Sequence, residues 1–131
     1  MRRSLLAIAL VAIGLPAGAQ MYGAEYTRCS ESSTVGIVDC VSAAAKNWDK
    51  RLNTAYQALA RRSDPAQREP LKGAQRLWVQ YRDANCRFYR AGEGSISQVE
   101  AAECVRAMTQ QRTCEMETAS RPEGGPVAGC R

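Results

Sequence analysis

Apolar residues first recur with alternating steps of three and four along residues 38–59. This spacing places them on one stripe of a helix that packs against its neighbours. The stripe consists of Val38, Val41, Ala45, Trp48, Leu52, Ala55 and Leu59. The helix should end near residues 61–65, because Pro65 disfavours helical backbone at Asp64. Ser63 or Asp64 can then cap a following helix.

A second helix is predicted over residues 66–89, and a third after a turn at residues 90–97. The expected apolar face of the second is Leu71, Ala74, Leu77, Trp78, Tyr81, Ala84 and Phe88. Pro70 should lie in its first turn or mark its true start. Ser95 or Ser97 should cap the third helix, whose expected inner residues are Val99, Ala102, Val105, Met108 and Met116. The pattern predicts an all-α fold, a small disulfide-bonded antiparallel three-helix bundle.

The first residues have the order of a secretory signal peptide: two arginines, an apolar run and the small residues Ala17–Ala19. We therefore expect a signal peptide at 1–19, an N-terminal loop segment at 20–36, a helical domain at 37–119 and a Pro/Gly-rich tail at 120–131. The apolar run is too short to span a bilayer, so no stable membrane insertion is expected. The predicted location is periplasmic or secreted.

Charge and composition narrow the possible partners and chemistry. The formal net charge of the 131 residues is +5, and removal of the signal peptide would take away Arg2 and Arg3. The remaining basic excess is mild and scattered, which is not typical of a nucleic-acid-binding protein. The chain contains no histidine, which removes the commonest general base. We expect no cofactor, no metal and no nucleic-acid partner.

Six cysteines in a short exported chain indicate a disulfide framework. In the expected bundle, Cys40, Cys86 and Cys104 share one end, and Cys29 can fold back to reach it. This favours Cys29–Cys40 and Cys86–Cys104, although the other pairings of these four remain open. Cys114 and Cys130 would then pair and tie down the tail.

Motifs along all three predicted helices resemble the LprI-type lysozyme inhibitor N-terminal domain family. They are DKRLNTAYQAL at 49–59, LKGAQRLWVQYRDANC at 71–86, GS at 94–95, Cys104 and TQQR at 109–112. The similarity extends from about Cys29 to Arg112. It implies an exported helical protein whose partner is a lysozyme-type muramidase, and it implies inhibition of that enzyme.

The polar residues of these motifs are interpreted as a structural network within the bundle. The set is Asp49, Asn53, Tyr56, Gln75, Trp78, Arg82, Asp83 and Arg112. Asp49 is expected to accept hydrogen bonds from Arg82 or Arg112, because the planar guanidinium can hold a carboxylate with two bonds. Trp78 and Tyr81 are expected in the core. A carboxylate held by arginine makes a poor general acid, so no catalytic residue is assigned.

Two surface features are candidate binding sites for a partner. The turn that contains Glu93, Gly94 and Ser95 could enter a partner's cleft, fixed by the nearby disulfide and helped by an acidic spot at Glu93, Glu100 and Glu103. A basic set could bind envelope polyanions or cell wall instead: Lys46, Lys50, Arg51, Arg61, Arg62, Arg68 and Arg76. A glycosidase would need two carboxylates across a cleft, which the acidic residues of the third helix do not offer. The expected function is muramidase inhibition, and the alternative is a polyanion-binding or structural envelope protein.

Overall fold

The computed structural model describes residues 21–121 and 123–130, which form four helices and no strand. The helices are α1 (Ala24–Cys29), α2 (Thr34–Arg62), α3 (Pro65–Arg90) and α4 (Ile96–Ala119). The all-α class is therefore confirmed. The expected signal peptide at 1–19 lies outside the described residues. The segment 20–36 was expected to be loop, which is wrong for α1 and for the first residues of α2.

Local sequence explains where the long helices begin. The Ser33 side chain accepts a hydrogen bond from the Gly36 amide at the start of α2. Asp64 and Gln67 form a reciprocal capping box at the start of α3. Pro70 is neither in the first turn nor at the start, as had been expected, but inside α3. This position is exposed, so water can satisfy the carbonyl that proline leaves without a helical donor.

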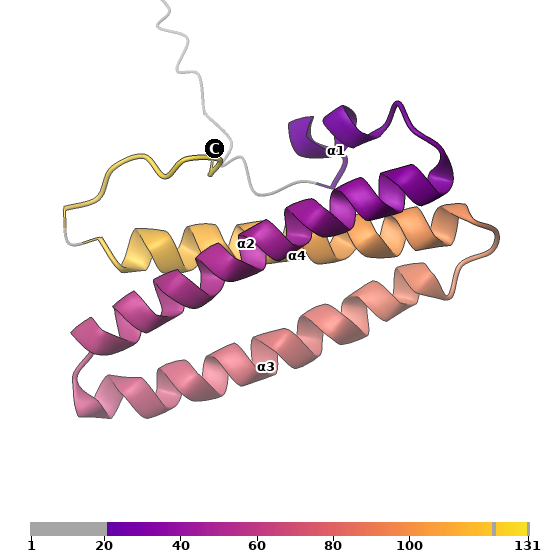
Figure 1. Ribbon diagram of the computed structural model, residues 1–131. Coiled ribbons are helices and arrows are strands. Elements are labelled where there is room, and N and C mark those ends of the chain that lie inside the picture. The colour runs from indigo at the N-terminus through magenta and orange to yellow at the C-terminus, as the bar shows by residue number, and fades with distance from the viewer. Residues whose placement is uncertain (1–20, 122, 131) are drawn as a thin grey trace, which may run out of the picture.

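Figure 1 shows α2 and α4 running in the same direction, with α3 antiparallel to both. Helix α4 contacts α2 most extensively and also packs on α3. Helices α2 and α3 have few direct contacts away from the turn that joins them. In the same view, α1 and the C-terminal segment lie on the side of the α2–α4 pair away from α3. Helix α4 is thus the common support of the fold.

The stripe predicted for α2 faces the interior. Five of its members are buried, namely Val41, Ala45, Trp48, Leu52 and Ala55. One core cluster joins Leu52 and Ala55 to Met116 of α4, with Trp78 of α3 packed against it. Helix α3 differs, because Cys86 is its one buried residue. Leu77, Tyr81 and Phe88 were expected to face inward, and they are exposed.

The interior face of α4 is more polar than expected. Val99 and Met116 are buried as predicted, whereas Ala102, Val105 and Met108 are only partly buried. The fully buried positions between Val99 and Met116 include Glu103, Arg106, Thr109 and Thr113. Among the described residues, no buried side-chain nitrogen or oxygen lacks a hydrogen-bond partner. The polar core is therefore satisfied, as buried polar groups need to be.

Three disulfides hold the helices and the tail. They join Cys29 to Cys40, Cys86 to Cys104, and Cys114 to Cys130. The first fixes α1 to the start of α2, the second joins the end of α3 to α4, and the third attaches the C-terminal segment to α4. Each closes a loop whose unfolded state would otherwise have more freedom, an effect worth roughly 2–4 kcal/mol per bond.

Candidate functional site

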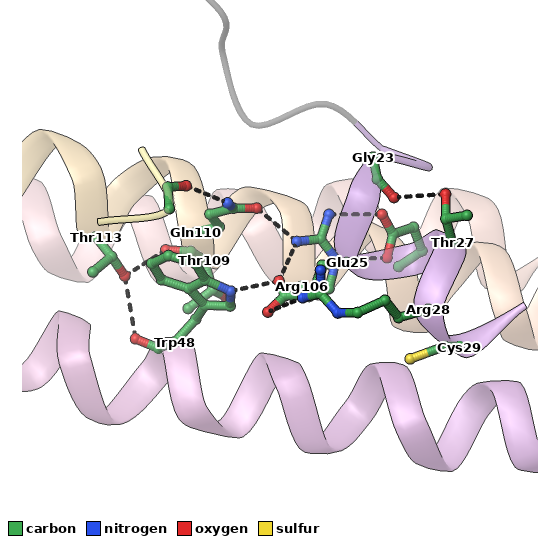
Figure 2. A network of polar contacts seen from close by, with 12 residues as sticks. Gly23, Glu25, Thr27, Arg28, Cys29, Trp48, Arg106, Thr109, Gln110 and Thr113 are labelled. Carbon is green, nitrogen blue, oxygen red and sulfur yellow. Dashed lines mark hydrogen bonds and ion pairs between the residues drawn. The ribbon is translucent and has the colours of Figure 1, made fainter. Parts of the chain in front are cut away.

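A buried ion network connects α4 to α1 (Figure 2). The Arg106 guanidinium donates two hydrogen bonds of 2.7 Å to the two carboxylate oxygens of Glu103. It also donates to Glu25 Oε2 at 2.8 Å and to Gln110 Oε1 at 2.6 Å. Trp48 Nε1 donates to the same Glu25 oxygen at 2.7 Å. One arginine therefore organises side chains from α1, α2 and α4.

The network keeps Arg106 charged despite its burial. Burial acts to lower the pKa of Arg106, but hydrogen bonds and charge interactions, first with Glu103 and then with Glu25, raise that pKa overall. Glu103 has no exposed surface, and its Oε1 also accepts from the Tyr22 amide at 2.8 Å. Every polar group of the network thus has a hydrogen-bond partner within the protein.

The C-terminal segment closes over the network from the outside. Gln110 Nε2 donates to the Gly129 carbonyl at 2.7 Å. Arg51 lies over the Trp48 ring, pairs with Glu117 and donates to the Ala128 carbonyl. The tail is therefore an integrated part of the structure in this region.

The hydrogen bonds expected between Asp49 and Arg82 or Arg112 are only partly formed. Arg82 Nη1 lies 3.9 Å from Asp49 Oδ1, a long ion pair, while its nearer partner is Asp83 at 2.9 Å. Asn53 donates to Asp49 at 3.3 Å. Asp49 and Asp83 are about half exposed, whereas Arg82 is mostly covered. These residues lie near the surface, and their contacts are looser than those of the partly buried network that had been expected.

Arg112 belongs to a different contact. Its Nε donates to Gln75 at 3.1 Å and its Nη1 to Glu115 at 2.8 Å, and it makes no pair with Asp49. Tyr56 and Trp78 pack against the core cluster, with Arg82 stacked 5.2 Å from the Trp78 ring centroid. Tyr81, expected in the core, is 61% exposed. The motif residues therefore divide among several small contacts between the helices.

A surface groove runs between α2 and α3 with α4 as its floor. It consists of two adjoining hollows of about 370 Å³ each, which share Ser42, Ala102 and Val105. Lys46, Asp49 and Arg82 line the first hollow, while Asp83, Arg87 and Arg90 line the second. Both carboxylates are paired with the Arg82 guanidinium, Asp83 more closely than Asp49. This groove can hold a polar or extended segment.

The turn between α3 and α4 is exposed and firmly held. Ala91 and Gly92 donate backbone hydrogen bonds to α3, and Ser97 Oγ donates to the Gly94 carbonyl at 2.8 Å. Gly94 has a φ of +70°, a left-handed conformation that glycine adopts without steric cost. Ser95 is the N-cap of α4, yet its side chain makes no capping hydrogen bond. Its hydroxyl is therefore not used to stabilise the helix start.

The acidic spot expected beside this turn is smaller than predicted. Glu103 was assigned to it and is instead buried against Arg106. Glu93 is exposed and Glu100 partly so. The basic set is also divided, because Arg51 is engaged by Glu117 and Arg68 donates to the carbonyls of Ala60 and Ser63. The expected basic face is therefore reduced to five residues: Lys46, Lys50, Arg61, Arg62 and Arg76.

Two further kinds of site are absent from the part of the chain that the structure describes. No helix there has the length and apolar character needed to cross a membrane. No group of three or more acidic, cysteine or histidine side chains there is arranged to hold a metal ion.

The Arg106 network is the principal set of contacts that was not predicted from the sequence. A signal was present, since Glu103 and Arg106 are oppositely charged residues on the same α4 stripe as Val99 and Met116. Glu25 had no such signal, because it belongs to a short helix without apolar periodicity.

Comparison with known proteins places the chain in a family. An uncharacterized protein of Rhizobium meliloti (strain 1021), R02472, is 34% identical over 79 residues, which are 59% of this chain and 53% of that protein. The chain thus matches about half the length of that relative. No solved structure matches it. The family model described as lysozyme inhibitor LprI matches residues 27–116, which include α2, α3 and most of α4. With more than half of its residues matched by that model, the chain belongs to the LprI lysozyme inhibitor family.

Proposed function

We propose that this chain is an exported, periplasmic or secreted protein that binds a lysozyme-type muramidase and inhibits it without catalysing a reaction. Family membership supports the class of partner. In this proposal α2, α3 and α4 are the three-helix bundle of the family, and the bundle presents the inhibitory turn at one end. The observation that carries the proposal is the held, exposed turn at residues 91–95, which has an unused serine hydroxyl.

The turn is suited to binding because its backbone is already ordered before a partner binds. Cys86–Cys104 joins its two flanking helices, and the Ser97–Gly94 hydrogen bond holds its tip. A segment already fixed in its bound shape loses less conformational entropy on association than a flexible one. The preorganised turn therefore favours a tight complex from a small contact.

The chemistry of the turn matches a glycosidase cleft. Such a cleft contains two carboxyl groups, one protonated and one ionised. The Ser95 hydroxyl can donate to the ionised carboxylate, and the Glu93 carboxylate can accept from the protonated one. Glu93 also gives this end of a basic protein a local negative charge toward a basic enzyme.

Inhibition is tested with oxidised protein lacking residues 1–19, titrated against a lysozyme that is clearing a cell-wall suspension. The proposal expects the rate of clearing to fall with inhibitor concentration. Glu93→Ala combined with Ser95→Ala should raise the concentration for half-inhibition by at least about tenfold, the range for hydrogen bonds to charged groups. Because Ser95 makes no capping bond, Ser95→Ala should leave the helix intact.

Glu123→Ala is the matched control, since it removes the same charge at an exposed position in the tail. It should inhibit like the unaltered protein. Absence of inhibition at tens of micromolar by a folded, disulfide-bonded protein would contradict the proposed function. Equal losses in the turn variant and the control would contradict the assignment of the turn.

A further inference from the structure

Helix α3 carries a second apolar stripe that faces away from the bundle. Its members are spaced by 4, 3, 4, 3 and 4 residues and are all exposed: Pro70, Ala74, Leu77, Tyr81, Ala84 and Phe88. Leu77, Tyr81 and Phe88 are 62%, 61% and 74% exposed. Alternating steps of four and three residues over five helical turns are the pattern of a coiled-coil seam. Core packing does not explain it, because the opposite face of α3 contacts α4.

We propose that this stripe is a homodimer interface, formed by the α3 helices of two copies packed antiparallel. The positions that flank the seam suit a second helix. On one side they are Gly73, Gln80 and Arg87, and on the other Leu71, Trp78 and Asn85. Arg87 is the one charged member, so two copies can approach with little cost in desolvated charge.

Charge selects the antiparallel direction. When the two-fold axis passes between Leu77 and Tyr81, each Leu77 packs beside Tyr81 of the second copy, and each Pro70 beside Phe88 of the second copy. The same register brings Glu69 within two residues, about 3 Å along the axis, of Arg87 of the second copy. Symmetry creates this opposite-charge contact twice. A parallel pair in register would leave Glu69 of one copy and Arg87 of the other 18 residues apart along the axis, so it would lack this contact.

This interface is independent of the proposed inhibitory turn. Residues 91–95 lie beyond the end of α3, outside the stretch from Pro70 to Phe88. A dimer of this kind would present two turns at opposite ends, because antiparallel helices point their ends in opposite directions. The assembly would therefore be bivalent toward muramidase molecules while leaving each turn accessible.

Sedimentation velocity of the oxidised protein without residues 1–19, from about 1 µM to about 500 µM, tests the proposal over the range of modest affinities. We expect a reversible shift from monomer to dimer with concentration. Leu77→Glu should raise the dissociation constant at least about tenfold by placing charge in the seam. Val35→Glu is the matched control, because Val35 is 70% exposed on α2 and outside the stripe. It should dimerise normally.

Charge exchange tests the direction of packing. Glu69→Arg and Arg87→Glu should each weaken the dimer, and the two together should restore it. A monomer at every concentration, or equal effects of Leu77→Glu and Val35→Glu, would overturn the interface. Failure of the double variant to recover would overturn the antiparallel register. If Leu77→Glu abolishes muramidase inhibition by a monomeric protein, the stripe is a surface for the enzyme and the homodimer is overturned.

Discussion

Arg106 and Glu103 face each other through two hydrogen bonds of 2.7 Å, with 1% of the arginine and none of the glutamate exposed. Both residues lie on α4, where the sequence suggested an ordinary apolar stripe. Their pairing extends to Glu25 and through it to Trp48, so a local contact becomes the joint between three helices.

Replacing Arg106 should destabilise the fold strongly. Arg106→Met would leave the Glu103 carboxylate buried without its counter-ion, which typically lowers the free energy of unfolding by roughly 3–5 kcal/mol. Urea unfolding of the oxidised protein, followed by tryptophan fluorescence, measures this loss. Arg112→Met is the control, because its partner Glu115 is about half exposed. It should cost less than about 1 kcal/mol, and similar losses in both variants would contradict the assigned role of Arg106.

Gly129 should tolerate no side chain. Its φ is +75°, and an added Cβ would lie 2.9 Å from the Trp48 ring. Gly129→Ala should therefore lower the free energy of unfolding by about 1–3 kcal/mol through backbone strain and a steric clash. Gly124→Ala is matched, since Gly124 has a φ of +70° but open space around it. Thermal unfolding should show the larger loss for Gly129→Ala, and equal losses would mean that contact with Trp48 contributes nothing.

The disulfide at the tail should contribute stability without being needed for the helices. Cys114→Ser with Cys130→Ser opens a loop that spans 16 residues, for which chain entropy predicts a loss of about 3 kcal/mol. Far-UV circular dichroism should change little, while cleavage after Glu123 by a glutamate-specific protease should become faster. Unchanged cleavage would show that the contacts of Gln110 and Arg51 hold the tail without the bond.

Tyr22 should make the protein sensitive to alkaline pH. Its pKa is raised, first by burial and then by the negative charge of Glu100. The unfolded chain releases this proton near pH 10, whereas the folded protein retains it to higher pH, so stability falls as pH rises from about 10. Tyr22→Phe removes this part of the slope and keeps the backbone bond to Glu103. Identical stability–pH curves for both proteins above about pH 9 would contradict the assignment.

The sequence predicted the long helices well because their stripes and caps are local. The steps along α2 identified its buried face, and Asp64 with Pro65 marked the start of α3. The Arg106 network was missed because charged side chains interrupt the α4 stripe, and apolar periodicity alone assigns such residues to the surface. Tyr81 and Phe88 were misplaced for the opposite reason: an apolar stripe on α3 does not reveal which of two faces meets the core.

The candidate site shows the same limit. Residues 91–95 were expected to form a turn and do, but whether a hydroxyl such as that of Ser95 is engaged depends on geometry that spacing does not give. Likewise, the distance from Asp49 to Arg82 is set by how far α2 diverges from α3. The angle between two helices depends on all the side chains at their contact, including those on α4.

The central place of α4 has a consequence for the order of assembly. A chain synthesised from its N-terminus completes α2 and α3 before α4 exists, and these two helices meet mainly at their turn. Two of the three disulfides also await cysteines at or beyond position 104. The nascent protein therefore lacks most of the contacts between its long helices until α4 has been made. A version shortened at Arg90 would have helices but no common support on which to fold.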